Sequence, residues 1–308
     1  MKNAIISYNN SNNLGDYIQS IAAKNFFKKE PILIDRESLV NYNYKKVKII
    51  MNGWFMENPE NWPPSDKIIP LFISFHINPT AEKKILTKKG INYLRKFEPI
   101  GCRDNYTKKL LNKVNIKAYF TGCLTLTLNK KKYINKSIKN DVLIISVFER
   151  LLPSSINYEI NFKLILNLIK IPFKYFLYKK GMRNILKNIS SNRNVKHISQ
   201  IIKKKESINE KYILAENQLK EIANSNLVIT SRIHSALPAI AFGVPVVFLN
   251  DGLDHINHFS RIDGLNLFFK SINSSELSNI DIKKIIPKKK HLDFSNLMSE
   301  KIKNFINK

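Results

Sequence analysis

The sequence predicts an α/β protein with two Rossmann-like domains that face a cleft. Strand-like and helix-like segments alternate along the chain, which is typical of largely parallel sheets covered by helices. The 308 residues, 44% of them hydrophobic, can form two cores of ordinary size. A polar, lysine-rich segment, Asn129–Asn140, separates the two halves and is the predicted linker.

We expect an N-terminal domain over residues 1–130 and a C-terminal domain over residues 141–290. The helical pattern Asp293–Ile306, within residues 291–308, is expected to pack back across the first domain. The predicted strands of the first domain are Ala4–Tyr8, Ile32–Ile34, Val47–Asn52, Ile68–Ser74, Pro99–Arg103 and Ala118–Phe120. Its predicted helices are Asp16–Lys28, Ala81–Lys96 and Asn105–Lys113.

The second domain begins with Asp141–Val147, an apolar run suited to a parallel strand that is covered on both faces. Its other predicted strands are Val195–Ile198, Leu227–Thr230 and Val244–Leu249. Its predicted helices are Ile213–Ser225, Ile233–Phe242 and His255–Asp263. Ligands of parallel sheets bind beyond the carboxyl ends of the strands, so the loops after these strands are the candidate sites.

The net charge of +27 suits an anionic partner: nucleic acid, an anionic membrane surface or an acidic substrate. The lysines are spread along the whole chain, and no zinc-finger, RNP-like or helix-turn-helix motif occurs. We therefore expect no nucleic-acid partner. A cytoplasmic membrane surface is favoured, because anionic lipid attracts dispersed basic groups.

Two cysteines, Cys102 and Cys123, are too few for a disulfide framework, and no Cys/His spacing typical of a metal site occurs. The N-terminus lacks the pattern of a signal peptide. No uncharged apolar stretch reaches the roughly 18 residues of a membrane span. We expect a cytoplasmic protein with reduced cysteines, no metal and no transmembrane helix.

The segment Phe162–Lys180 is apolar, aromatic and basic at once. Its lysines and Pro172 argue against a membrane span. Two interpretations stay open. A pair of interfacial helices could hold the protein on an anionic membrane through residues 160–180. Alternatively, a helix in this segment could dock on the protein core.

The stretch Leu227–Leu249 is the most informative part of the chain. It has the pattern of a buried strand, a short turn, an apolar helix and a second buried strand. Polar residues gather at the turn and the start of the helix: Thr230, Ser231, Arg232, His234 and Ser235. Helix N-termini expose free N–H groups and the positive end of the dipole. An arginine and a histidine there predict a phosphate or carboxylate site with a group that can transfer protons.

Other polar side chains follow other predicted strands. Asp16 ends an asparagine-rich loop and could cap a helix, bind a hydroxyl or act as a base. Arg103 could reach the cleft or form a surface ion pair with Asp104. Glu149 and Arg150 are further candidates. No glycine-rich dinucleotide or Walker motif occurs.

Five short motifs occur together: Asn13–Gln19, Asn52–Phe55, Ile100–Asp104, Thr121–Thr127 and Thr230–Pro245. In this order they resemble the motifs of the polysaccharide pyruvyl transferase family, and the resemblance covers roughly residues 10–265. The resemblance implies a two-domain fold like that of GT-B glycosyltransferases. It also implies transfer of pyruvate from phosphoenolpyruvate to a pair of sugar hydroxyls as a ketal, in the assembly of cell-surface polysaccharide.

This reaction requires groups that clamp two anionic moieties and groups that move protons, and it needs no cofactor. We expect His234 and Asp16 to be the catalytic residues. The expected donor contacts are Arg232, Ser231, Thr230, Ser235 and Arg150, and the expected acceptor contacts are Asn13, Trp54 and Arg103. The expected partners are phosphoenolpyruvate and a saccharide acceptor, free or lipid-linked.

Two alternatives remain. A glycosyltransferase of GT-B type would place the phosphates of a nucleotide sugar at the same helix N-terminus. A basic membrane- or nucleic-acid-associated protein without catalysis is the third hypothesis, and the Arg232/His234 turn weighs against it.

Overall fold

The computed structural model describes residues 1–55, 58–149, 162–189, 193–251, 253, 255–279, 284–287 and 289–307. For Trp54, Asn279 and residues 162–170 it describes the backbone alone.

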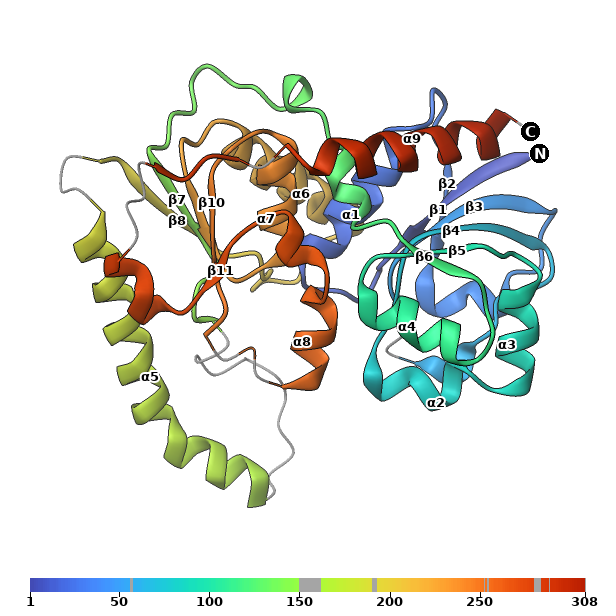
Figure 1. The fold of residues 1–308 in the computed structure, drawn as a ribbon, viewed down its shortest axis with the longest axis horizontal. Helices are drawn as coiled ribbons and strands as arrows, with labels where there is room; N and C mark the ends of the chain where they lie inside the picture. Colours follow the sequence, from blue (N-terminus) through green and yellow to red (C-terminus); the bar gives the residue numbers. More distant parts are fainter. Residues whose placement is uncertain are drawn as a thin grey trace.

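Two parallel sheets confirm the predicted α/β class with two Rossmann-like domains (Figure 1). The first has the order β2-β1-β3-β4-β5-β6 and the second the order β11-β10-β9-β7-β8, and every described pairing is parallel. The strands of the first sheet are β1 (Lys2–Ser7), β2 (Ile32–Asp35), β3 (Val47–Phe55), β4 (Ile68–Ile77), β5 (Ile100–Cys102) and β6 (Ala118–Phe120). Those of the second are β7 (Val142–Ile145), β8 (Val195–Ile198), β9 (Val228–Thr230), β10 (Val246–Leu249) and β11 (Ser271–Ile272).

Helices connect these strands and cover both sheets (Figure 1). They are α1 (Leu14–Lys24), α2 (Glu82–Ile85), α3 (Lys88–Arg95), α4 (Asn105–Lys113), α5 (Phe162–Asn188), α6 (Ile208–Ala223), α7 (Ile233–Ala241), α8 (Ile256–Ile262) and α9 (His291–Asn307). The expected single helix Ala81–Lys96 is two helices, because the Thr87 side chain accepts a hydrogen bond from Gly90 N and starts α3 anew.

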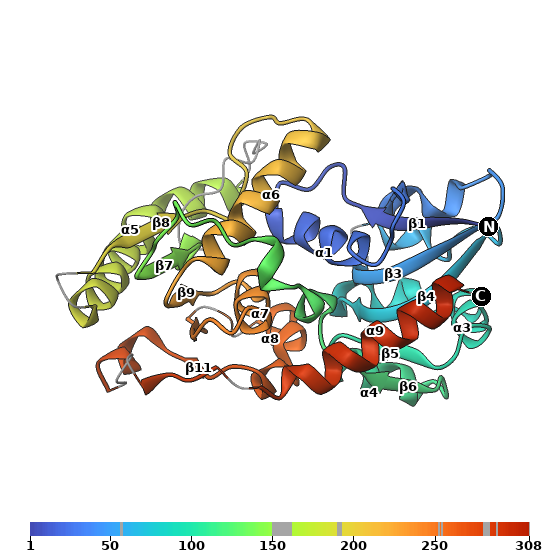
Figure 2. The same cartoon turned by 90° about the horizontal axis from the view of Figure 1, so that it is seen from above.

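Helix α1 holds the two domains together. It packs against α6 and α7 of the C-terminal domain, and one continuous apolar core includes Leu14 and Ile18 from α1 with Leu219 and Ile233 from those helices. Figure 2 shows α1 beside α6. The expected helix start at Asp16 was wrong, since α1 begins at Leu14. The cap is the residue before it, whose side-chain oxygen accepts from Gly15 N at 3.1 Å.

Helix α9 runs back from the C-terminal domain along the N-terminal one (Figures 1 and 2). Lys48 on β3 donates a hydrogen bond from Nζ to the carbonyl of Phe305 at 3.1 Å, and Ser74 on β4 contacts the sulfur of Met298 at 3.4 Å. The last helix of the chain therefore ties the second domain to the first sheet.

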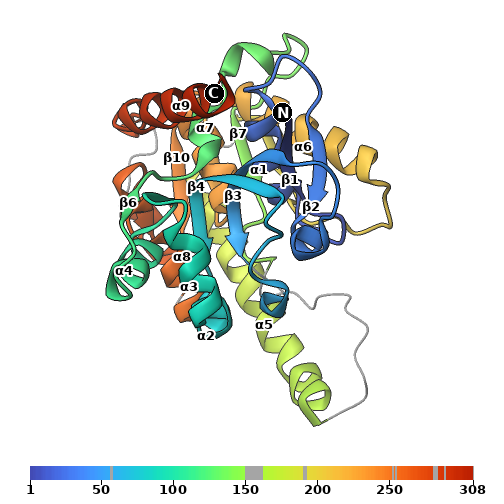
Figure 3. The same cartoon turned by 90° about the vertical axis from the view of Figure 1, so that its right-hand side faces the viewer.

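Helix α5 lies on the outer side of the C-terminal domain, and its first half extends away from the body of the molecule (Figure 3). The expected pair of interfacial helices was wrong, because one helix continues through Pro172. A proline inside a helix removes one backbone hydrogen bond but need not end the helix. Met182 and Ile185 anchor the second half in the core. In the described part of the chain, no helix is both long and apolar enough to cross a membrane.

Candidate functional site

The loops at the carboxyl ends of the two sheets meet at the domain interface. Asn13, after β1, forms an antiparallel bridge with Ile201, after β8. Leu14 N donates to the carbonyl of Gln200 at 2.9 Å. On the other side of the interface, Asn105 N donates to the carbonyl of Asp263 at 2.9 Å. The candidate site is thus built by both domains, in the position where open parallel sheets bind ligands.

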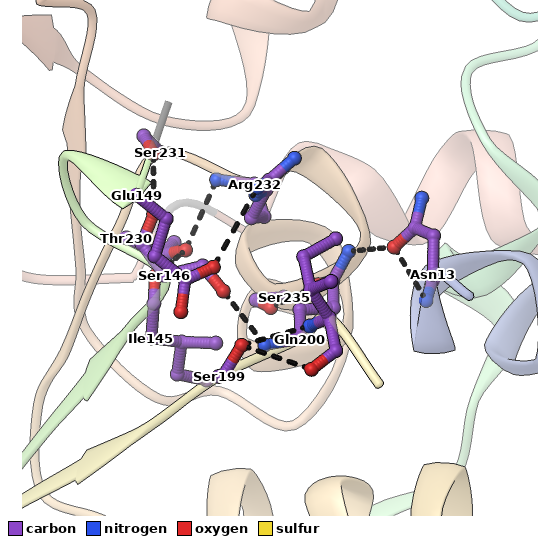
Figure 4. Close-up of polar contacts among 12 residues, drawn as sticks. Asn13, Ile145, Ser146, Glu149, Ser199, Gln200, Thr230, Ser231, Arg232 and Ser235 are labelled. Carbon is purple, nitrogen blue, oxygen red and sulfur yellow. Dashed lines mark hydrogen bonds and ion pairs between the residues drawn. The ribbon is translucent and has the colours of Figure 1, made fainter. Parts of the chain in front are cut away.

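The turn after β9 is fixed by its hydroxyl groups (Figure 4). Thr230 donates from Oγ1 to the carbonyl of Ile145 at 2.9 Å and accepts from Arg232 N at 3.0 Å. Ser231 donates from Oγ to the carbonyl of Ser146 at 2.9 Å. Two of the expected donor contacts therefore tie the turn to the end of β7, and they hold the backbone of Arg232 in place.

Ser235, the third expected hydroxyl contact, belongs to a buried amide network (Figure 4). Its Oγ donates to Gln200 Oε1 at 2.6 Å and accepts from Gln218 Nε2 at 3.0 Å. Gln200 Nε2 in turn donates to Asn13 Oδ1 at 2.7 Å. Asn13, an expected acceptor contact, thus caps α1 and links it to the C-terminal domain.

Arg232 is the N-cap residue of α7, where the helix dipole is positive. Its Nη2 lies 3.6 Å from Oε2 of Glu149, and its Nε has no hydrogen-bond partner among the described residues. Burial lowers the pKa of Arg232, although Glu149 opposes the shift. Arg232 is thus a largely desolvated cation whose hydrogen-bonding capacity is only partly used.

His234 is the second residue of α7 and is 1% exposed. Its Nε2 has no hydrogen-bond partner in the described ranges. Burial lowers the pKa of His234 well below its ordinary value, and the nearby cations Arg103 and Arg261, together with His76, add to the shift. The imidazole is therefore neutral at pH 7 in the donor-free chain.

Arg103, which follows β5, is fully buried, which rules out the surface ion pair that was one of its two interpretations. Its Nε lies 3.6 Å from Oδ2 of Asp104, which is also fully buried. None of its three guanidinium nitrogens has a hydrogen-bond partner among the residues that the structure describes. Arg103 also lowers the pKa of His234 across the interface, which places its charge near the β9 turn.

Sequence reasoning missed His76. It is the penultimate residue of β4 and is fully buried. Its Nδ1 lies 2.6 Å from Oδ2 of Asp104. A polar residue at the carboxyl end of a buried strand was the available signal. Its partner could not be identified, because that partner follows a different strand.

The remaining expected residues have other surroundings. Asp16 is 7% exposed and accepts hydrogen bonds from Ser11 Oγ at 2.6 Å and Gln19 Nε2 at 3.3 Å, near but not in the β9 turn. Trp54 lies at the end of β3, with only its backbone described. Arg150 lies outside the described residues.

A cavity of about 20 Å³ lies at the interface, and its lining includes Asn13, Gln200, Arg232, His234, His258 and Arg261. The lining thus combines cations from the C-terminal domain with the capping loop of α1. Within the described ranges, no group of three or more His, Cys, Asp or Glu residues could hold a metal ion. The arrangement suits an anion and offers imidazoles for proton transfer.

A sequence model of the polysaccharide pyruvyl transferase family matches residues 13–252. No protein with a curated description matches the chain. The uncharacterized protein KP1_0663 from Klebsiella pneumoniae is 14% identical, with a TM-score of 0.49, over 88% of this chain and 93% of that chain. UDP-GlcNAc 2-epimerase of Methanocaldococcus jannaschii is 13% identical, with a TM-score of 0.41, over 94% of each chain. At these scores the structural similarities carry no conclusion about the reaction.

Proposed function

The chain belongs to the polysaccharide pyruvyl transferase family, and on that premise we propose that it transfers a pyruvyl group from phosphoenolpyruvate to a saccharide. The product is a ketal on two sugar hydroxyls in a cell-surface polysaccharide or its lipid-linked precursor. The observation that carries the proposal is a pair of desolvated guanidinium groups near His234. Arg103 lowers the pKa of His234, and Arg232 caps the helix on which His234 lies.

The donor carries a phosphate and a carboxylate, and a guanidinium can bind either one through two parallel hydrogen bonds. Arg103 and Arg232 supply one such group from each domain. In the proposed reaction His234 delivers a proton to the methylene carbon of the donor. Its pKa is low in the donor-free chain, and the negative charge of the bound donor raises it into a useful range. The reaction requires no cofactor.

Donor entry requires the domains to separate. The interface cavity of about 20 Å³ is little larger than the roughly 10–15 Å³ that a water molecule needs. Arg103 and His234 are at most 1% exposed. We infer that the contacts across the interface open to admit the donor and close over it, which excludes water from the reacting groups.

A donor screen by thermal shift tests the proposal. Phosphoenolpyruvate should stabilise the protein, because a ligand at 100 times its Kd contributes about 2.7 kcal/mol to folding. Inorganic phosphate and pyruvate are the controls, since each carries only one of the two anionic groups. Stabilisation by nucleotide sugars without any by phosphoenolpyruvate would refute the proposal and support a glycosyltransferase.

We further propose that α5 holds the enzyme on the cytoplasmic face of an anionic membrane, where a lipid-linked acceptor resides. Phe173 is 65% exposed and Phe176 57% exposed, near the middle of α5. The helix has lysines and arginine but no acidic residue. Exposed aromatic groups with flanking cations are the features of an interfacial helix.

A double change, Phe173→Ser with Phe176→Ser, should weaken binding to vesicles that contain phosphatidylglycerol by at least about tenfold, since each ring contributes buried apolar area. Both side chains are exposed, so the fold should persist. The matched control is Tyr44→Ser with Ile213→Ser, which are 74% and 57% exposed on other elements. Co-sedimentation measures the affinity. Equal binding by the two double variants would contradict a membrane role for α5.

A further inference from the structure

The pair His76 and Asp104 is unexplained by packing alone. Both side chains are fully buried. His76 lies on β4 and Asp104 follows the neighbouring strand β5, since Phe75 on β4 pairs with Cys102 on β5. Asp104 is the N-cap of α4, and its Oδ1 accepts from Thr107 N at 2.9 Å. Its other oxygen, Oδ2, lies 2.6 Å from His76 Nδ1, and Thr107 Oγ1 lies 3.3 Å from the same nitrogen. The carboxylate thus lies close against one nitrogen of the imidazole.

This contact defines the tautomer of His76. Burial lowers the pKa of His76 to about 4; Asp104 opposes the shift and Arg103 and Arg261 add to it, so the ring is neutral at pH 7. Burial alone would raise the pKa of Asp104, but its coupling to His76 and the charge of Arg103 keep that pKa below its ordinary value. An ionised oxygen only 2.6 Å from Nδ1 requires a proton between them. The lone pair is therefore on Nε2.

His76 Nε2 is buried and has no hydrogen-bond partner in the described part of the chain. A histidine that merely fills the core would have both ring nitrogens satisfied, because an unmet buried polar atom costs about 1–3 kcal/mol. A carboxylate that fixes one nitrogen and leaves the other as an unpaired acceptor is the arrangement of a general base.

His76 also lies at the domain interface. Helix α8 of the C-terminal domain packs against α4 and against the 3₁₀ turn Pro79–Ala81, which follows β4 directly. Arg261 of α8 contributes to the lowered pKa of His76, and His76 in turn contributes to that of His234. Separation of the domains would move α8 away from this end of β4 and expose His76 to the site.

We propose that His76, oriented by Asp104, is the general base that accepts a proton from the attacking hydroxyl of the saccharide. The inference rests on the proposed pyruvyl transfer. Two imidazoles then face the reaction from opposite domains. His234 acts on the donor, and His76 acts on the acceptor.

The protons and bonds of the proposed reaction balance. His234 gives a proton to the methylene carbon, the first hydroxyl oxygen bonds to the adjacent carbon, and its proton goes to His76 Nε2. The bond from that carbon to the phosphate oxygen then breaks with its electron pair. The second hydroxyl oxygen takes the vacated place and passes its proton to the departing phosphate. A proton transfer from His76 to His234 through solvent restores both residues.

The test separates donor binding from transfer in the variant His76→Gln. Calorimetric titration with phosphoenolpyruvate measures donor binding. Initial rates of ¹⁴C transfer from labelled phosphoenolpyruvate to membranes of source cells that lack this gene measure the reaction without an identified acceptor. We expect a donor Kd within about threefold of wild type and a transfer rate lower by about 10²- to 10⁴-fold. His197→Gln, the same change at an exposed histidine outside the interface, should retain wild-type values.

The pH profile distinguishes a base from a structural residue. The wild-type rate should rise with pH as His76 loses its proton, and the residual rate of His76→Gln should lack this rise. Asp104→Asn should lower the transfer rate at least about tenfold, because the tautomer of His76 is no longer fixed. If His76→Gln does not fold, the rate of Asp104→Asn tests the role of His76 instead. A transfer rate above half of wild type in the folded variant, or equal losses of binding and rate, would overturn the role of His76. Failure of wild type to bind phosphoenolpyruvate would instead refute the proposed function, and the role of His76 with it.

Discussion

Replacing Arg103 by methionine should destabilise the donor-free protein and nearly abolish binding of phosphoenolpyruvate. The guanidinium is fully buried and lacks hydrogen-bond partners among the described residues, with only Asp104 at 3.6 Å to offset its charge. An apolar side chain of similar length fills the same space but supplies no charge to the neighbouring carboxylate. Asp104 keeps its contacts with His76 and Thr107 N, but it becomes a buried carboxylate without a cation beside it, because the His76 ring is neutral.

The expected loss of unfolding free energy is about 3–5 kcal/mol, which is the usual cost of removing one partner of a buried ion pair. Each kcal/mol should lower Tm by roughly 2–4 °C. Loss of a buried charge-assisted contact should weaken donor binding by about 2–5 kcal/mol, or roughly 30- to 5000-fold in Kd.

Thermal unfolding and calorimetric titration measure the two effects on the same samples. The control is Arg95→Met, because Arg95 is exposed and bonds only the carbonyl of Val114 at 3.2 Å. That variant should bind the donor normally and keep wild-type stability. A folded Arg103→Met that binds phosphoenolpyruvate as tightly as wild type would show that Arg103 has only a structural role.

The sequence alone left two interpretations of Arg103 open, a contact in the cleft and a surface ion pair. An arginine next to an aspartate usually forms an exposed ion pair, and local sequence contains no sign that β5 ends inside the molecule. The burial of Arg103 results from the closure of two domains, with Asn105 N bonded to the carbonyl of Asp263 far along the chain. Such long-range packing is invisible in a single stretch of sequence.

The parts of the fold that the sequence predicted well are those with local signals. The bounds Asn105–Lys113 and Val195–Ile198 agree with the structure, since Asp104 caps the helix and a β-branched residue stands at each end of the strand. The strand β11, Ser271–Ile272, was not predicted, because two residues give no periodicity. The continuity of α5 through Pro172 was also missed, since tertiary packing of its second half outweighs a local helix breaker.

The candidate site was likewise predicted only where its signals are local. The β9 turn was identified from its own residues, but the hydrogen bonds of its hydroxyl groups were not. Thr230 and Ser231 bond to carbonyls of the β7 end, a strand that is distant in sequence and adjacent only in the sheet. Residues expected to contact the donor instead fix the backbone that presents Arg232 and His234. His76 escaped notice for the related reason that Asp104 reaches it from the neighbouring strand.

His234→Gln should lower the rate of pyruvyl transfer by about 10²- to 10⁴-fold while donor binding weakens only slightly, because the amide can form hydrogen bonds but cannot deliver a proton to carbon. The assay of ¹⁴C transfer to membranes measures the rate, and His197→Gln is again the matched control. Full rate in the variant with donor bound would remove His234 from the mechanism.

Proton uptake offers a second, independent test of His234. In the donor-free chain, burial and the cations Arg103 and Arg261 hold its pKa below the ordinary value, so the ring is neutral at pH 7. A bound anion raises that pKa, and binding must then take up protons, which makes wild-type donor affinity increase as pH falls through the donor-bound pKa. Calorimetry in buffers of different ionisation enthalpy measures this uptake. His234→Gln should abolish most of it, and an unchanged uptake would mean that the donor protonates a different group.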